Sequence, residues 1–577
     1  MPSAYRVLPT ATGPCGLDLK AVTMSTKNDP VDVIVVGLGA CGGTAVKVLC
    51  EAGMKVVAFD KGPWLDAAKD FSGDEIKFVN RNYLWPDPTL YPRTLRHDED
   101  SVAKRFQFSP TPQLVGGGTN HWAGWVPRPR ESDFMLKSLH GDLPGASLAD
   151  WPFRYDHLEP YLTKVEWEFG IAGIAGADKY EPFRSKGYPS PPLRPTRWGK
   201  KFYDACNKLG INAFPLPHAM VTTEHKGRKP FNHTSFWNQY GDPSGARSNT
   251  LTTFVPEAVA TGNLEVRPEC FVRQVKVGKD GRATGVVYID TDGNEHEQDA
   301  GIVILTLGAI ESARLLLMSR SAQHPDGLAN SSGQVGKNAT FHEYLFAVGL
   351  FDKEIDDPLY GWTGNYISGG SLEFYETDHD RGHMGGCIIA ASQITHPVNW
   401  VFPGRPSWGD ALKDADRNFF NYAMKIGLIL HDLPVEKNRV DLDPTVTDTF
   451  GMPVARITHR PHPNDVAMGK WQVDKNVEIL QAAGARKTVP VYLEEMTGNT
   501  CHQHGTARMG FDPKTTVLNE WCQAHDVANL FVLDGSSFPT STGVNPTLTM
   551  MANAWRCSEY ITDVYAKGRE EHLAVPR

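Results

Sequence analysis

The side chains best suited to proton chemistry lie toward the C-terminal end of the chain. His502 and His504 are two residues apart, and Asn545 directly precedes Pro546. An imidazole whose pKa lies near the working pH takes up a proton readily, and a carboxamide N–H donates to an oxygen that gains negative charge. Asn545 also stands where a helix N-cap is expected, so this residue alone does not separate a chemical role from a structural one.

Glycines indicate a second kind of chemistry early in the chain. Gly37, Gly39 and Gly42 form a G-x-G-x-x-G pattern between an expected strand at 31–36 and an expected helix. Such glycines allow a tight turn, close approach of a pyrophosphate and close helix packing. Asp60, 23 residues after Gly37, ends the next expected strand and suits a ribose hydroxyl. The pattern predicts a dinucleotide site rather than a glycine turn without a ligand, and it does not separate FAD from NAD.

A second glycine-rich segment, VGGGTNHW at 115–122, is a candidate surface for a flat ring. Gly117 and its neighbours let the backbone lie against such a ring, and Asn120, His121 and Trp122 follow directly. The alternative interpretation is a glycine loop with an ordinary packed His-Trp pair.

The elements that must position these residues are typical of an α/β protein. Apolar runs and helical patterns alternate, with strands expected at 31–36, 55–59, 302–308 and 530–533 and helices at 42–52, 309–319 and from 546. Residues 340–495 instead show short strand-like segments separated by Gly/Pro turns, typical of an antiparallel sheet. We predict a Rossmann-like domain, a parallel sheet with helices, interleaved with an α+β domain built on an antiparallel sheet.

Composition excludes several classes of function. The net charge is −9 and no Lys/Arg block occurs, which argues against a nucleic-acid partner. The nine cysteines form no C-x-x-C, so no metal site is expected. The chain has no run of 18 apolar residues and no signal-peptide pattern, so we expect no transmembrane segment and a cytoplasmic protein. A periplasmic or peripheral-membrane location is the alternative if the chain is exported with a partner subunit.

With these motifs in this order, the chain resembles the glucose–methanol–choline (GMC) oxidoreductases from about residue 31 to about residue 565. The landmarks are GLGACGG, VGGGTNHW, ILTLGAIESARLLL, NRVDLDP, HQHGTARMG and DGSSFPTSTGVNPTLT. The resemblance is to the branch with gluconate 2-dehydrogenase and fructose dehydrogenase large subunits and pyranose oxidase, which carries a G-G-x-x-x-H-W loop and a C-terminal N-P-T.

The resemblance implies roles for the three C-terminal polar residues. His502 matches the catalytic histidine of the family, and Asn545 matches its partner. His504 stands where relatives usually have a small or apolar residue, so it is a rival or a helper to His502.

The resemblance also implies contacts with FAD. Asp534 matches the acid at the ribityl and pyrophosphate part, and Val272 lies in the strand expected at the adenine end. His121 matches the histidine that some relatives join covalently to the flavin, and whether this chain does so stays open. A helix that begins at Pro546 and Thr547 would point its positive end at flavin N1 and the C2 carbonyl.

The implied activity is FAD-dependent hydride transfer from a secondary alcohol of a sugar or sugar acid, with a histidine base. The alternatives are a pyranose or glycoside oxidase that uses O₂, an oxidase of a non-sugar alcohol, and a catalytic subunit that needs a small partner subunit and a cytochrome. The electron acceptor would be a quinone, a cytochrome subunit or O₂. Some relatives carry an iron–sulfur cysteine cluster at the equivalent of 230–250, where this chain has no cysteine, so no such centre is expected.

The same reasoning divides the chain into interleaved domains. Residues 1–30 are expected to be a disordered extension. The FAD-binding domain is predicted from 31–150, 246–345 and 496–577, and the substrate-binding domain from 151–245 and 346–495.

Overall fold

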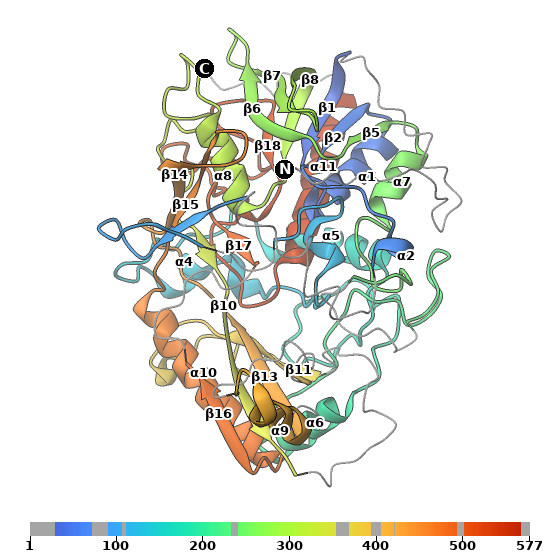
Figure 1. Ribbon diagram of the computed structural model, residues 1–577, viewed down its shortest axis with the longest axis vertical. Helices are drawn as coiled ribbons and strands as arrows, with labels where there is room; N and C mark the ends of the chain where they lie inside the picture. Colours follow the sequence, from blue (N-terminus) through green and yellow to red (C-terminus); the bar gives the residue numbers. More distant parts are fainter. Residues whose placement is uncertain are drawn as a thin grey trace.

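The computed structural model describes residues 29–71, 91–106, 111–231, 241–352, 369–393, 405–419, 422–492 and 501–566. Nearly all of the expected N-terminal extension, and residues 232–240 of the segment without cysteine, lie outside the described residues. Figure 1 shows a large sheet with its helices in the upper part of the view and a smaller sheet with helices in the lower part.

The larger sheet is built on the strand–turn–helix unit that the sequence predicts. β1 (Val31–Val36) leads into α1 (Ala40–Glu51) and then β2 (Val56–Phe59). β1 pairs in parallel with β2 on one side and with β8 (Glu295–Leu305) on the other. β5 (Leu264–Arg267) and β18 (Leu530–Val532) extend the parallel part. The β-branched run of β1 suits a strand that is covered on both faces.

β8 is long enough to belong to two arrangements. Its C-terminal half lies in the parallel sheet, and its N-terminal half pairs antiparallel with β7 (Ala283–Ile289), which pairs with β6 (Phe271–Val277). α8 (Ala309–Met318) follows β8. α11 (Thr547–Ala566) packs against both α1 and α5 (Tyr155–Phe169).

The smaller body is an antiparallel sheet, as expected for 340–495. Its strand order is β11-β12-β13-β10-β16. The bounds are β10 Glu343–Leu350, β11 Gly369–Ser371, β12 Cys387–Gln393, β13 Ala423–Leu430 and β16 Lys487–Val491. α10 (Pro463–Ala482) and α6 (Arg197–Lys208) pack on this sheet, and together they enclose a separate apolar core.

Two short sheets connect the larger parts. One has the order β14-β15-β3-β4, and the other joins β9 to β17. Their bounds are β3 Thr94–Arg96, β4 Lys104–Arg105, β9 Thr340–Phe341, β14 Arg439–Thr447, β15 Pro453–Thr458 and β17 Gln503–His504. The remaining α-helices are α2 Ala67–Asp70, α4 Leu136–His140, α7 Phe254–Ala260 and α9 Gly409–Phe419.

The interleaved division of the chain stays a prediction, and two segments bear on where its boundaries lie. α5 lies within 151–245, which is predicted to belong to the substrate-binding domain, yet its apolar residues belong to the core of the larger sheet. β15 is predicted to belong there too, yet it pairs in parallel with β3. The mixed α/β fold with an antiparallel second sheet is confirmed.

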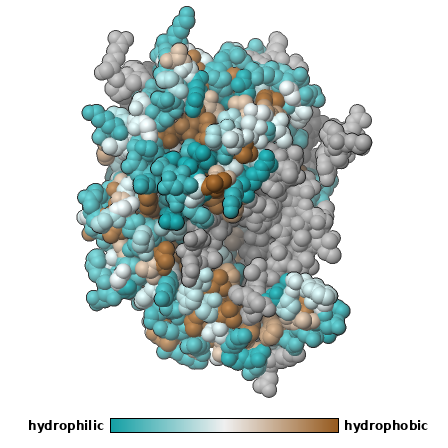
Figure 2. All heavy atoms as spheres, turned by 60° about the vertical axis from the view of Figure 1, so that its left-hand side comes forward, coloured by the Kyte–Doolittle hydropathy of each residue, from teal (hydrophilic) through white to brown (hydrophobic). Residues whose placement is uncertain are grey.

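The surface is ordinary for a globular protein. On the face in Figure 2, hydrophilic residues predominate and apolar ones are scattered among them. Among the described helices, none combines the length and the apolar character that a membrane span requires.

Candidate active site

A cavity of about 590 Å³ lies where the glycine-rich loops, the end of the larger sheet and the antiparallel sheet meet. This volume is in the range of small-molecule and cofactor sites. Most predicted site residues line it: Gly37, Gly39, Asp60, Gly117, His121, Trp122, His502, Asp534, Asn545, Pro546 and Thr547. Gly42, Asn120, Val272 and His504 are not among the lining residues.

The floor of the cavity, which is its glycine wall, consists of the backbone of two loops that lie in contact, 37–43 and 115–119. Gly37 turns with φ of +97°, and its N–H donates to the Phe59 carbonyl at 2.7 Å. A Cβ on Gly42 would lie 1.9 Å from the Gly37 oxygen, so Gly42 serves helix packing. A Cβ on Gly117 would lie 2.8 Å from the Gly39 Cα. The two loops therefore leave a surface free of side chains, as a pyrophosphate and a flat ring require.

Asp60 is held by the backbone of the glycine loop. Its carboxylate accepts from the N–H of Leu38 at 3.0 Å and from the N–H of Gly62 at 2.9 Å. Burial raises the pKa of Asp60 despite these bonds. Val272 lies on β6, which begins beside Asp60: the N–H of Cys270 donates to the Asp60 carbonyl at 3.0 Å.

A buried ion pair stands beside Asp60 on the cavity wall. Arg93 donates to the Glu311 carboxylate at 2.8 Å. Burial opposes ionisation of Glu311, but Lys61 and Arg93 hold its pKa well below the usual range. Burial lowers the pKa of Lys61, which also lines the cavity. No local pattern marks these charges as part of a site, although Glu311 lies inside the landmark ILTLGAIESARLLL.

Both carboxylate oxygens of Asp534 accept hydrogen bonds from neighbouring backbone and hydroxyl groups. One oxygen accepts from the Gly308 N–H at 2.9 Å and the Ser312 hydroxyl at 2.6 Å. The other accepts from the N–H and the hydroxyl of Ser536 at 2.9 and 2.5 Å. Asp534 therefore fixes the turn from β8 into α8 and the loop after β18, and both turns border the cavity.

The 115–122 loop is braced from inside. The Asn120 amide donates to the carbonyls of Val115 at 2.9 Å and Gly117 at 3.1 Å, so this side chain shapes the loop. His121 packs edge-on against Phe71, with ring centroids 5.4 Å apart. Trp122 donates to the Ser248 carbonyl at 3.1 Å. His121 and Trp122 thus reach the cavity from a rigid support.

His502 and Asn545 come together at one end of the cavity. The Asn545 Nδ2 lies 3.5 Å from Nε2 of His502. α11 begins at Thr547, and the Pro546 carbonyl accepts the N–H of Met550 at 2.8 Å. Asn545 therefore precedes the cap position by one residue, which differs from the N-cap expectation and leaves its side chain directed at His502.

A third histidine, which no sequence motif indicates, supports His502. The Nδ1 atoms of His342 and His502 are 3.0 Å apart, so a single hydrogen lies between two ring nitrogens. The His342 N–H also donates to the His502 carbonyl at 3.3 Å. Enclosure lowers the pKa of His502 to about 4, so the ring is neutral at pH 7. Only the β9–β17 pairing reveals this partner, because 160 residues separate the two histidines.

His504 faces away from the cavity. Its ring stacks on Phe538 at a centroid distance of 5.5 Å and lies 4.8 Å from the His342 ring. Burial, and then the neighbouring His502, lower its pKa to about 3. Residues two apart in a strand share a face, but β17 begins at Gln503, so His502 lies outside the strand and the two rings point to different surroundings.

The opposite wall is the face of the antiparallel sheet. Tyr344, Ser392, Lys425 and Ile429 line the cavity there. Tyr344 is paired with Ile429 across β10 and β13, and Ser392 with Lys425 across β12 and β13. Within the described part of the chain, no carboxylate forms an ion pair with Lys425. No sequence motif marks these four residues, because their proximity depends on strand register.

Comparisons with known proteins agree with this geometry. Family models for GMC oxidoreductase match residues 34–344 and 434–554. The 2-methyl-1,2-propanediol dehydrogenase of Mycolicibacterium austroafricanum is 35% identical, over 93% of this chain and 96% of that protein. The gluconate 2-dehydrogenase flavoprotein of Pantoea cypripedii is 29% identical, over 95% and 96%.

Solved structures show the same fold. A formate oxidase from Aspergillus oryzae, whose structure addresses FAD modification, aligns with a TM-score of 0.63 at 15% identity, over 95% of this chain and 100% of that one. A pyridoxine 4-oxidase from Mesorbium loti aligns with a TM-score of 0.62 at 16% identity, over 92% and 99%. The side-chain-free floor beside Asp60 fits FAD, and the chain belongs to the GMC oxidoreductase family as an FAD-dependent enzyme.

Proposed function

We propose that this enzyme oxidises a CH–OH group of a small polyhydroxylated compound, with His502 as the base. The observation that carries the proposal is the pairing of His502 and Asn545 at one end of the FAD-sized cavity. FAD, when bound, supplies the hydride acceptor. The hydroxyl proton must leave as well, and His502 is the group on this chain that can receive it.

The contact between His342 and His502 explains how the His502 ring keeps the tautomer that a base requires. For Nε2 to accept a proton, the ring hydrogen must sit on Nδ1, and Nδ1 of His342 at 3.0 Å is its acceptor. This tautomer also matches the Asn545 amide, which donates toward Nε2 across 3.5 Å in the absence of substrate. His342 is a positioning residue, since it acts through His502.

Asn545 has a second task once a substrate hydroxyl lies beside His502. Its amide then donates to the substrate oxygen, which becomes more negative as the proton leaves. FAD would be held by the Gly39–Gly117 floor, by Asp60 at the ribose and by the α11 N-terminus at Pro546 and Thr547.

His121 would lie at the ring end of the cofactor, because it follows the Gly117 floor and reaches the same cavity. Whether it bonds to the flavin is decided by acid precipitation. Colour that stays in the pellet indicates a covalent link, and colour in the supernatant excludes one.

The preferred substrate class is a sugar or sugar acid oxidised at a secondary alcohol. Lys425 on the sheet wall favours the acid. Its ammonium group lies over the rings of Tyr344 and Phe346 and forms no ion pair among the described residues, so it suits a substrate carboxylate. A vicinal diol is the second candidate, supported by the 35% identity to 2-methyl-1,2-propanediol dehydrogenase. We further propose a dehydrogenase that passes electrons to a quinone or a partner cytochrome. Two similar proteins support a role as one subunit of a larger enzyme, because they are named gluconate 2-dehydrogenase flavoprotein and fructose dehydrogenase large subunit.

Anaerobic bleaching of the flavin tests this function. Wild-type protein is mixed with sugars, aldonates, glycosides and 1,2-diols, and the oxidised-flavin absorbance is followed before air is admitted. We expect rapid bleaching by one class, slow recovery in air, and loss of bleaching in His502→Ala. Protein that retains FAD and is bleached by none of these compounds contradicts the proposal, and fast recovery with peroxide contradicts the dehydrogenase assignment.

A further inference from the structure

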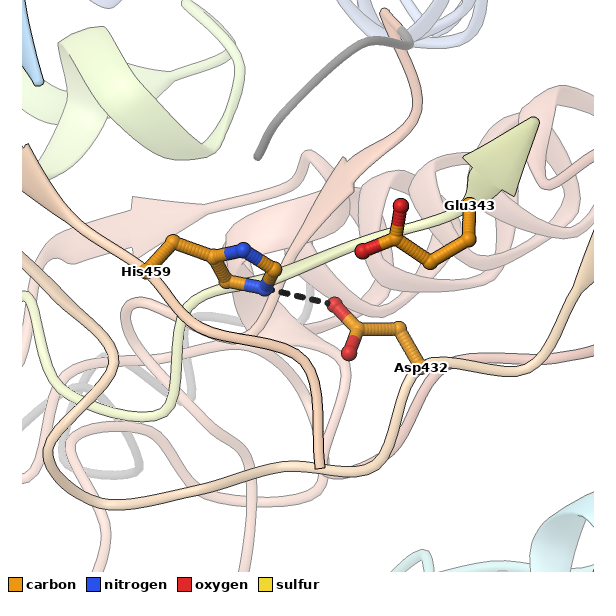
Figure 3. Close-up of side chains that lie close together, drawn as sticks. All are labelled: Glu343, Asp432 and His459. Carbon is orange, nitrogen blue, oxygen red and sulfur yellow. Dashed lines mark hydrogen bonds and ion pairs between the residues drawn. The ribbon is translucent and has the colours of Figure 1, made fainter. Parts of the chain in front are cut away.

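Directly behind the histidine pair lies a second cluster of chemically capable side chains. Glu343 is the first residue of β10, Asp432 follows β13 and His459 follows β15. Figure 3 shows the three side chains converging from separate segments. One ligand atom from each lies within 4.8 Å of the other two, and all three residues are buried. None of them lines the cofactor cavity.

The cluster contains buried polar atoms without partners. Asp432 uses Oδ2 to accept from the Phe341 N–H, and the same oxygen lies 3.1 Å from Nε2 of His459. Within the described chain, both oxygens of Glu343, Oδ1 of Asp432 and Nδ1 of His459 have no hydrogen-bond partner. Glu343 is only 3% exposed, and its carboxylate points at the other two groups. Buried polar atoms are costly when unsatisfied, so this arrangement calls for a ligand.

The charge balance leads to the same conclusion. Asp465, on the first turn of α10, is buried beside the cluster and accepts from the Leu433 N–H at 3.1 Å. Three buried carboxyl groups therefore lie close together, and among the described residues His459 is the one imidazole within hydrogen-bond distance of any of them. A divalent cation would let them keep their charge.

We infer that Glu343, Asp432 and His459 form a binding site for a divalent first-row transition-metal ion. One imidazole nitrogen with carboxylate oxygens is a donor set for Zn²⁺ or Mn²⁺ rather than for Mg²⁺, which prefers oxygen and water. Ligands around one such ion lie roughly 3–3.5 Å apart, so the three donors, which lie within 4.8 Å of one another, would move closer together on binding it.

The ion has a structural role. Its ligands come from the starts or ends of three strands in two sheets, so it ties β10 and β13 of the antiparallel sheet to the end of β15. Glu343 directly follows His342, and the Phe341 N–H is bonded to Asp432. The site therefore fixes the segment 341–343, from which His342 meets His502. This inference does not depend on the substrate or on the assignment of the base.

The test uses FAD-loaded wild-type enzyme, purified without chelator or affinity metal. Elemental analysis by mass spectrometry should find about one Zn²⁺ or Mn²⁺ per chain. EDTA treatment should lower Tm by about 5 °C or more, and micromolar Zn²⁺ or Mn²⁺, but not Mg²⁺, should restore it. FAD content, read from absorbance, should stay constant throughout.

Glu343→Gln separates a metal site from a hydrogen-bonded carboxyl cluster. If a metal binds, the variant should hold less than about a tenth of the wild-type metal, and EDTA should no longer change its Tm. If Glu343 is only a buried protonated acid, glutamine replaces it closely and Tm stays the same or rises. Glu159→Gln is the matched control, a buried glutamate in the Arg128 ion-pair network, and it should keep its metal.

The direct measurement on wild-type protein keeps the inference testable if a variant fails to fold. Wild-type enzyme without stoichiometric metal, and with a Tm that neither EDTA nor added Zn²⁺ or Mn²⁺ changes, overturns it. Full recovery with Mg²⁺ would overturn the assignment of a transition-metal site with a nitrogen ligand.

Discussion

The two walls of the cavity differ in the groups that they present, which are backbone on one side and side chains on the other. The glycine wall, formed by residues 37–43 and 115–119, presents backbone, and its shape comes from the absence of side chains. The sheet wall, formed by Tyr344, Ser392, Lys425 and Ile429, presents side chains from three paired strands. A cofactor common to a family can be held by backbone, whereas a substrate that differs between members must be recognised by groups that change.

The largest expected effect comes from filling the glycine wall. A Cβ on Gly39 meets only the Gly117 Cα, at 3.9 Å, so Gly39→Val should fold while the added side chain occupies the cofactor site. We expect a folded, colourless protein, judged by circular dichroism and flavin absorbance. Gly42→Val should instead fail to fold, because its Cβ would overlap the Gly37 carbonyl. A yellow Gly39→Val enzyme would contradict the assignment of the glycine wall to the cofactor.

The next largest effect is expected at His502, the proposed base. His502→Ala should slow single-turnover flavin reduction by about 100-fold or more with FAD retained, since losing a general base typically costs that much. His504→Ala should slow it far less, because His504 stacks on Phe538 outside the cavity, and should mainly lower Tm. Stopped-flow reduction under anaerobic conditions measures both. A larger rate loss in His504→Ala would exchange their roles.

His342 should give an intermediate effect that depends on the replacement. His342→Ala removes the acceptor for Nδ1 of His502, and loss of such an orienting partner typically costs roughly 10–100-fold. The loss should appear in kcat more than in KM. Asparagine at this position, which also offers an acceptor, should recover part of the rate, whereas a purely structural role would show no such rescue.

The smallest effect is expected from a change in the sheet wall, at Lys425. Lys425→Met should raise KM several-fold for an acidic substrate and leave kcat and FAD content unchanged, because one carboxylate contact is lost. A neutral sugar or diol serves as the internal control and should show no change. Equal effects on acidic and neutral substrates would remove the argument for a sugar acid.

What could be predicted from the sequence follows the same division. Short contiguous motifs identify the Gly37–Gly42 turn, Asp60, His502 and Asn545 as candidates, and Gly37, Asp60, His502 and Asn545 all line one cavity. Asn120 was placed with the cofactor because it lies within such a motif, yet its amide turns into its own loop. His342 and Lys425 were missed because they reach the site only through strand pairing between distant segments. Periodicity gives the elements but not the register that joins them.

The β9–β17 ladder has a consequence for synthesis. It pairs Phe341 with Gln503, and α11 then covers α1, which was made some 500 residues earlier. Contacts so distant in sequence form late, because a long loop must close before they repay its entropy. During translation the glycine turn can form early, but the cavity lacks the His502–Asn545 pair and the start of α11 until residues 502–547 leave the ribosome. FAD retention should therefore be a late event in the maturation of this enzyme.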